Sequence, residues 1–219
     1  MGSDDLHKKE KLRKSRAKAR MRVVKERRVK TRILVLTEGE TEEEYISKLA
    51  ESFKDKITVD TSSNCPTCPL GMARKANDLK ACDKDYDAIF LVFDLDVVSA
   101  EKLNEVEQIA NSNNLTLIKT DPCFEYWLLL HFNFTTKPYE RLPDKSPCDQ
   151  VVSDLRKIEG MESYDKVASM NTPLLISKTS TAITHSKRSL DQSNEVGKSN
   201  PSTNMHELVQ YITSPPEQS

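Results

Sequence analysis

Carboxylate side chains follow two short apolar runs of this sequence, residues 33–36 and 89–93. The carboxylates are Glu38, Glu42, Asp94 and Asp96. Ligands of a parallel α/β sheet gather outside the carboxyl ends of its strands, so two neighbouring strands here would bring all four carboxylates to one edge. Such a cluster repels itself unless a divalent cation neutralises it, and Mg²⁺ (or Mn²⁺) prefers oxygen ligands of this kind. The pattern therefore predicts a metal site suited to phosphate chemistry.

The spacing of these residues favours a shared site. Asp94 and Asp96 are separated by one residue, so in an extended backbone both carboxylates lie on the same side. Glu42 follows Glu38 by one helical turn and can point at the same cation, while Gly39 allows the backbone to approach a phosphate. Alternatives stay open, because Glu38 could instead cap a helix and an Asp-x-Asp pair also suits a surface turn.

A further carboxylate, Glu125, lies in the densely apolar segment 124–132. Burying a carboxylate without a partner is costly, so Glu125 should contact a cation, a basic side chain or a backbone amide. The alternative is that Glu125 is a helix N-terminal charge after Pro122. His131 could donate a proton, although a single histidine on an apolar helix is more typical of a core residue. Trp127 is expected in the core.

Alternating strands and helices must position these side chains. The sequence predicts strands over residues 33–36, 57–60, 88–93 and 115–119. It predicts helices over residues 40–53, 70–82, 100–111, 124–132, 150–158, 177–189 and 206–212. We therefore expect an α/β fold, with a four-stranded parallel sheet flanked by helices on both faces and a helical C-terminal extension. Residues 192–199 are polar and expected to be loose.

Charge is distributed unevenly along the 219 residues. Residues 1–32 hold fourteen Lys and Arg against four Asp and Glu, a net charge of +10, whereas the remainder has a net charge of −11. A basic arm on an acidic body is a common layout for nucleic-acid binders, and this arm has too little apolar surface to order itself. Candidate nucleic-acid contacts are Arg13, Arg16, Arg20, Arg27, Arg28 and Lys178.

The remaining composition places limits on location and metal chemistry. No window is apolar enough to span a membrane, and the N-terminus lacks the apolar core of a signal peptide. The odd number of five cysteines favours reduced thiols and hence a cytoplasmic protein. Cys65 and Cys68 have the spacing of half a zinc site, but no second such pair follows. A pair of free thiols is the alternative reading, and both stay open.

Four stretches in this order resemble a known family. They are EGETE at 38–42, FDLD at 93–96, DPCFEYWLLLHF at 121–132, and NPST with HELV between 200 and 209. The first two are similar to the Toprim domain of topoisomerases, primases and overcoming-lysogenization-defect nucleases. The whole series, from about residue 31 to about 212, resembles the RloB-like family of abortive-infection proteins from bacterial anti-phage loci.

This resemblance implies a fold and an activity. Residues 33–120 would form a Toprim-like core, residues 121–212 a helical extension of the same domain, and residues 213–219 a disordered tail after the flexible arm at 1–32. The activity would be Mg²⁺-dependent cleavage of phosphodiester bonds in DNA or RNA. Glu38 would be the general acid/base. Together with Glu42, Asp94 and Asp96 it would also hold one or two cations.

Other functions stay open at this point. The family motif around Glu125 makes that residue an active-site candidate as well. The chain has no Walker A motif, so any ATP-driven control would come from a separate ATPase subunit. One alternative is a nucleic-acid-binding or partner-binding module of a defence complex without catalysis of its own. Another is a nucleotidyl transferase.

Overall fold

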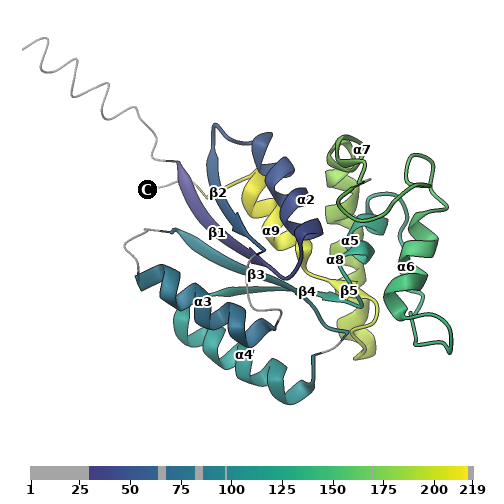
Figure 1. The fold of residues 1–219 in the computed structure, drawn as a ribbon, viewed down its shortest axis with the longest axis horizontal. Helices are drawn as coiled ribbons and strands as arrows, with labels where there is room; N and C mark the ends of the chain where they lie inside the picture. The colour runs from purple at the N-terminus through teal and green to yellow at the C-terminus, as the bar shows by residue number, and fades with distance from the viewer. Residues whose placement is uncertain (1–29, 64–67, 82–85, 97, 169, 217–219) are drawn as a thin grey trace, which may run out of the picture. The chain divides into compact units, whose positions relative to one another are not determined.

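The sheet has five strands in the order β2-β1-β3-β4-β5. The computed structural model describes residues 30–63, 68–81, 86–96, 98–168 and 170–216, and residues 31–216 pack as one compact unit (Figure 1). The strands are β1 (Thr31–Thr37), β2 (Ile57–Ser62), β3 (Ala88–Asp94), β4 (Thr116–Asp121) and β5 (Ser202–Thr203). The first four are parallel, and β5 pairs antiparallel with β4.

Helices cover both faces of this sheet. They are α2 (Glu40–Glu51), α3 (Pro69–Ala81), α4 (Ala100–Asn113), α5 (Glu125–Leu130), α6 (Pro147–Leu155), α7 (Thr172–Ser177), α8 (Thr179–Val196) and α9 (Met205–Thr213). In Figure 1, α3 and α4 lie on one side of the sheet and α2 and α9 on the other. The predicted α/β fold class, with a sheet flanked by helices and a helical C-terminal part, is confirmed.

Alternate residues of β1 face two separate cores. Ile33 and Val35 pack with the cluster formed by α2, α5 and α9, whereas Leu34 and Leu36 pack with α3 and α4. All four side chains are at most 3% exposed. A parallel strand covered on both faces is apolar throughout, which explains why the run that precedes the carboxylates shows no polar alternation.

The prediction of a purely parallel, four-stranded sheet was wrong because β5 was missed. This strand has only two residues, too few for any periodic signal. Tertiary contacts hold it in place: the hydroxyl groups of Thr120 and Thr203 lie 2.9 Å apart. The side chain of Asn204 accepts a hydrogen bond from the backbone N–H of Lys119 (2.7 Å) and donates one to the carbonyl of Leu117 (2.9 Å).

The prediction that residues 192–199 are loose was wrong for residues 192–196, because α8 continues to Val196 and is capped by Gly197, which adopts a left-handed φ of 69°. The inward face of α8 consists of small residues, and these gave no apolar signal. Ser186 donates a hydrogen bond to the carbonyl of Thr203 (2.8 Å), and Ser189 donates one to the carbonyl of Pro201 (3.2 Å). Hydrogen bonding, more than apolar periodicity, therefore specifies this helix.

Smaller differences concern the boundaries of elements. The strand β1 begins at Thr31, inside the predicted arm, and α9 extends to Thr213, inside the predicted tail. The helix α7 was not predicted, and α5 is shorter than the predicted segment 124–132. Within the described residues, no helix combines the length and apolarity needed to cross a membrane.

Candidate active site in an acidic cleft

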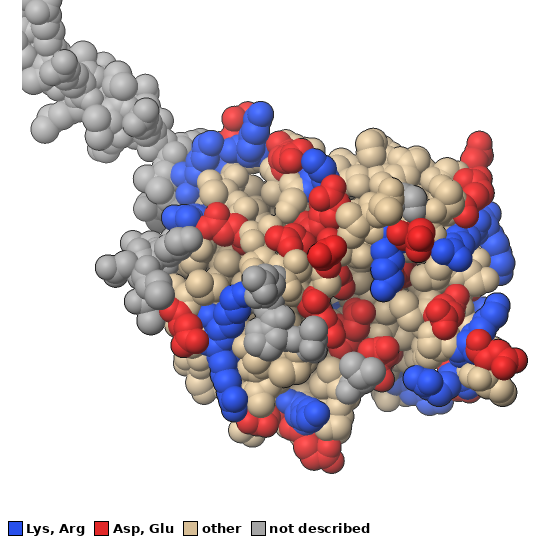
Figure 2. Space-filling model, in the orientation of Figure 1, with Lys and Arg blue, Asp and Glu red and all other residues tan. Residues whose placement is uncertain are grey.

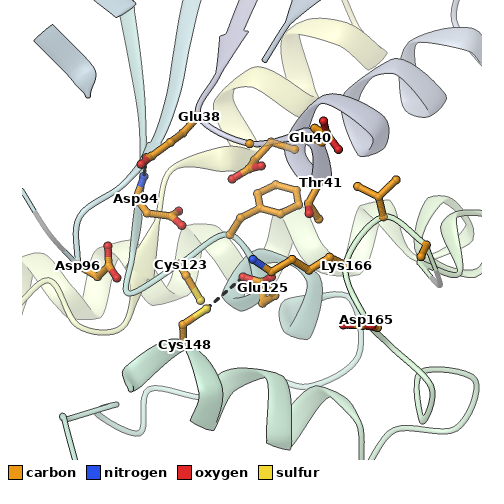
Figure 3. A pocket seen from close by; sticks show the side chains of 15 residues that line it. Glu38, Glu40, Thr41, Asp94, Asp96, Cys123, Glu125, Cys148, Asp165 and Lys166 are labelled. Atoms are coloured by element: carbon orange, nitrogen blue, oxygen red, sulfur yellow. Dashed lines mark hydrogen bonds between the residues drawn. The ribbon is translucent and has the colours of Figure 1, made fainter. Parts of the chain in front are cut away.

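A cleft of about 680 Å³ opens beside the carboxyl ends of β1 and β3. These strands are neighbours, with Thr37 opposite Val92, so the residues that follow them meet at one edge. The described residues that line the cleft include seven carboxylates and one lysine. The carboxylates are Glu38, Glu40, Glu42, Asp94, Asp96, Glu125 and Asp165. Figure 3 shows most of these side chains around the cavity, and Figure 2 shows acidic side chains gathered near the middle of this face.

Glu38 joins the ends of the two strands. Its backbone N–H donates to the carbonyl of Val92 (3.2 Å), and its carboxylate accepts a hydrogen bond from the backbone N–H of Asp94 (3.3 Å). Burial raises the pKa of Glu38 above its ordinary value. Burial and the nearby charge of Glu42 raise the pKa of Asp94 well above its own ordinary value. These carboxyl groups are therefore held close together in a site that disfavours their ionised forms.

Glu42 is the most deeply placed of the α2 acids, with 6% of its surface exposed. Burial, followed by the charges of Glu125 and Glu38, raises its pKa to about 7. Its carboxylate occupies the space beside Gly39: a Cβ atom there would lie 2.7 Å from Glu42 Oε2. Gly39 itself has an extended backbone, with φ at −129°. Glycine is thus needed here for room and not for an unusual backbone angle.

Glu125 is the first residue of α5 and is 5% exposed. Its two oxygens have different partners: the hydroxyl of Tyr164 donates to Oε1 (3.2 Å), and the thiol of Cys148 donates to Oε2 (3.4 Å). The expected partner was a cation, a basic side chain or a backbone amide, and the hydrogen bonds found are of another kind. Neither Tyr164 nor Cys148 is near Glu125 in the sequence, so no local pattern could have revealed them.

Asp96 does not lie in the extended backbone that was expected beyond the predicted strand 88–93. The strand β3 ends at Asp94, and the backbone bends at Leu95, whose N–H donates to the carbonyl of Thr120 (2.9 Å). The period-two argument for Asp94 and Asp96 was therefore wrong. Asp96 nevertheless lines the cleft, as an exposed residue of the turn.

Lys166 contributes the lysine of the cleft lining and was missed in the sequence. Its backbone has a φ of 55°, in the left-handed region that is uncommon for residues other than glycine. Figure 3 shows its side chain extending toward Glu125. The positive charge of Lys166 lowers the pKa of Glu42, whereas burial and the charges of Glu125 and Glu38 raise it. The segment around Lys166 has no periodic pattern, so only the fold brings it to the carboxylates.

A comparison with known families matches residues 33–212 of this chain to a family described as RloB-like protein. The chain belongs to the RloB-like family. The matched range contains all five carboxylates predicted as site residues, together with Lys166. Neither the curated proteins nor the solved structures provide a match.

Other predicted residues of this RloB-like protein lie elsewhere. Lys178 joins α7 to α8, with its ammonium group 5.6 Å from the ring centre of Phe132, and it does not line the acidic cleft. Cys68 is exposed and its thiol is free. Several predicted residues fall outside the described ranges, and these are Arg13, Arg16, Arg20, Arg27, Arg28 and Cys65.

His131 is a core residue of this RloB-like protein. It is fully buried, and its ring contacts the hydroxyl of Tyr45 (3.0 Å) and the carbonyl of Trp127 (3.0 Å). Burial lowers its pKa to about 4, so the ring is neutral at physiological pH. Trp127 is also fully buried, as predicted.

The donor atoms of the cleft are of the type that a hard divalent cation takes, although no three of the described carboxylates have their oxygens within 4.8 Å of one another. Glu38, Glu42 and Asp94 supply carboxylate oxygens, and burial, with a smaller contribution from the neighbouring negative charges, makes their ionised forms costly and raises their pKa values. A bound cation relieves that cost and needs oxygen ligands of this type. Asp96 at the rim could complete the coordination. Chemically, the cleft of this RloB-like protein can therefore bind a cation and, through it, a phosphate group.

Proposed function

We propose that this RloB-like protein is a Mg²⁺-dependent nuclease of the Toprim type, acting on DNA or RNA in bacterial anti-phage defence. The observation that supports the proposal is the convergence of Glu38, Glu42 and Asp94 in one cleft. Glu38 and Asp94 stand at two neighbouring strand ends, Glu42 lies in the first turn of α2, and the pKa values of all three are raised. Such groups suit both cation binding and proton transfer near neutral pH.

Glu42, Asp94 and Asp96 would hold the cation, with Glu38 beside them. When bound, the cation supplies charge stabilisation for the reacting phosphate and helps to orient the attacking oxygen. Glu38 is half-buried and fixed by the backbone of Asp94, so its carboxyl oxygen is positioned to accept a proton from the attacking water or hydroxyl.

Two further cleft residues have roles in this proposal. Lys166 provides a positive charge opposite the carboxylates and would contact a non-bridging oxygen of the scissile phosphate. Glu125 lies deeper and would orient groups in the cleft through the hydrogen bonds that it accepts from Tyr164 and Cys148. It would therefore position the reacting groups, whereas Glu38 would transfer the proton.

The setting of the reaction is also part of the proposal. The basic arm would bind the nucleic-acid backbone, because clustered Lys and Arg release condensed counterions from phosphates. We place the protein in the cytoplasm, in keeping with its odd number of cysteines and with the free thiols among the described residues. A separate ATPase subunit would supply any ATP-driven control.

Cleavage assays with the purified full chain test this proposal. Labelled duplex DNA, single-stranded DNA and RNA are incubated with Mg²⁺, with Mn²⁺, or with EDTA. The expected result is metal-dependent cleavage of at least one substrate that Asp94→Asn and Glu38→Gln abolish. The matched control is Glu51→Gln, a change of the same type at an exposed position of α2.

Other outcomes would favour other functions. Binding of nucleic acid without cleavage under any metal condition would favour a binding module. Incorporation of a labelled nucleotide without cleavage would favour a nucleotidyl transferase. Activity that survives Glu38→Gln but is lost in Glu125→Gln would move the catalytic carboxylate from the end of β1 to α5.

A further inference from the structure

A second group of potential ligands, with different chemistry, lies at the inner side of the acidic cleft. It consists of Cys123, Glu125 and Cys148, whose two sulfur atoms and one carboxylate oxygen all lie within 4.8 Å of one another. The three residues come from three places in the fold: the connection from β4 to α5, the first turn of α5, and the first turn of α6. Figure 3 shows the two thiol groups directed toward each other beside the carboxylate of Glu125.

The spacing matches the edge of a tetrahedral metal site. With a zinc–sulfur distance of about 2.3 Å and a zinc–oxygen distance of about 2.1 Å, sulfur and oxygen ligands lie about 3.6 Å apart. The observed distance from Cys148 Sγ to Glu125 Oε2 is 3.4 Å. The ligand pair that joins α5 to α6 is therefore already at the separation that zinc requires.

The surrounding structure holds these ligands in place. The hydroxyl of Tyr164 donates to the second oxygen of Glu125 (3.2 Å), as outer partners of metal ligands commonly do. Cys148 directly follows Pro147, and Ser146 and Asp149 form a reciprocal capping box that fixes the start of α6. Cys123 is 2% exposed and Glu125 is 5% exposed, so neither side chain is free to turn into solvent.

We propose that Cys123, Cys148 and Glu125 bind a thiophilic divalent cation of the zinc class, at a site distinct from the carboxylates that suit magnesium. Two sulfur ligands and one oxygen select zinc-like ions over hard cations, which take oxygen ligands. Three protein ligands leave the fourth tetrahedral position open, and it faces the acidic cleft, which the three residues also line. The inference does not rest on nuclease activity, because it follows from the ligand geometry alone.

Metal binding by the full chain tests the site, after the other cysteines are removed. The triple variant Cys65→Ser/Cys68→Ser/Cys82→Ser serves as the background, so that the Cys-x-x-Cys pair cannot contribute. Zn²⁺ binding is measured by competition with a chromogenic chelator, and Co²⁺ is used to detect thiolate-to-metal charge-transfer absorption. The background variant should bind one equivalent of Zn²⁺, and its Co²⁺ form should show sulfur coordination.

Graded losses of affinity are expected when the site is altered in this background. Tyr164→Phe removes a residue that hydrogen-bonds a ligand and should weaken Zn²⁺ binding by roughly 10- to 100-fold. Cys148→Ala removes a ligand itself and should weaken Zn²⁺ binding by more than this. Asp94→Asn should lower Zn²⁺ affinity far less than Cys148→Ala does and should leave the Co²⁺ charge-transfer absorption in place, because Asp94 interacts with the three ligands through its charge. Circular dichroism verifies the fold of each variant, and Cys148→Ser replaces Cys148→Ala if the alanine variant does not fold.

Three results would overturn the inference. The first is loss of all Zn²⁺ binding in the triple background, which would assign zinc to the Cys65–Cys68 pair. The second is Zn²⁺ binding that Asp94→Asn removes and Cys148→Ala leaves intact, which would assign it to the carboxylates. The third is a bound Co²⁺ ion without charge-transfer absorption, which would exclude thiolate ligands.

Discussion

Replacing Glu42 by glutamine should stabilise the fold at neutral pH when divalent cations are absent. The pKa of Glu42 rises from an ordinary 4.5 to about 7 in the folded protein, because the side chain is buried beside other carboxylates. The folded state therefore binds a proton more tightly than the unfolded state does. For a raised carboxyl pKa, stability is greatest below pH 4.5 and declines as the pH rises to about 7.

The size of this effect follows from the difference between the two pKa values. Each pKa unit corresponds to about 1.4 kcal/mol, so the rise from 4.5 to about 7 removes about 3 kcal/mol from the free energy of unfolding. Glutamine has nearly the same size but does not titrate, so the variant should lack this loss. Glu42 also raises the pKa of Asp94, and its removal should make the pH dependence shallower still.

Urea denaturation between pH 4.5 and pH 8 in EDTA measures this difference. The chain has a single tryptophan, Trp127, which is fully buried and reports unfolding by fluorescence. Relative to the wild type, Glu42→Gln should gain up to about 3 kcal/mol between the two ends of the pH range. Any constant effect of the amide cancels in this comparison. The exposed control Glu51→Gln should change by less than about 1 kcal/mol over the same range.

A pH-independent difference between Glu42→Gln and the wild type would refute this reasoning. It would mean that Glu42 keeps an ordinary pKa in the folded protein and that the cleft is better solvated than its burial indicates. Addition of Mg²⁺ at pH 8 provides a second, independent readout. If Glu42 is a ligand, Mg²⁺ should stabilise the wild type by about 2.7 kcal/mol at one hundred times its dissociation constant, and the variant by less.

The remaining predictions concern neighbouring features. Gly39→Ala should preserve the fold but push the Glu42 carboxylate aside, and this should reduce the apparent Mg²⁺ affinity in cleavage assays by roughly 10- to 100-fold. Lys166→Gln should slow cleavage by about 10²-fold and raise the pKa of Glu42 further, which pH-dependent denaturation would detect. His131→Gln should lower the free energy of unfolding by about 1–3 kcal/mol, as measured in urea, and leave cleavage per folded molecule unchanged. Removing residues 1–30 should weaken nucleic-acid binding broadly: if the arm contacts about four phosphates, the slope of log affinity against log salt should flatten by roughly 3 to 4 units. An unchanged slope, with loss of a protein partner instead, would assign the arm to assembly.

The strands and the acids that follow them could be predicted because both signals are local. A parallel strand buried on both faces is an uninterrupted apolar run, and Glu38 and Asp94 stand directly after such runs. The rule that ligands gather at the carboxyl ends of parallel strands then places both acids at one edge without further information. Glu42 also lines the cleft, but not by the expected helical turn from Glu38, because α2 begins only at Glu40, after the extended Gly39.

The rest of the cleft could not be predicted because it depends on long-range contacts. Cys148 and Tyr164 reach Glu125 from 23 and 39 residues away in the sequence. Lys166 enters the cleft through a left-handed backbone angle that no sequence periodicity encodes. Asp96 was expected in an extended backbone after the predicted strand 88–93, but the chain bends at Leu95 beyond the end of β3, and apolar periodicity gives no signal for a bend.

The position of β5 and α9 at the far end of the chain has a consequence for synthesis of the protein. The strand β5 pairs with β4, and α5 packs against both α8 and β5. Until residues 202–213 leave the ribosome, β4 has an unpaired edge, and the helix that begins with Glu125 lacks part of its packing surface. Contacts between residues so distant in sequence form late in folding. A nascent chain therefore contains the acids of the cleft before β4 and α5 have all their packing partners, and a chain interrupted near residue 200 would lack the contacts that β5 and α9 make with β4.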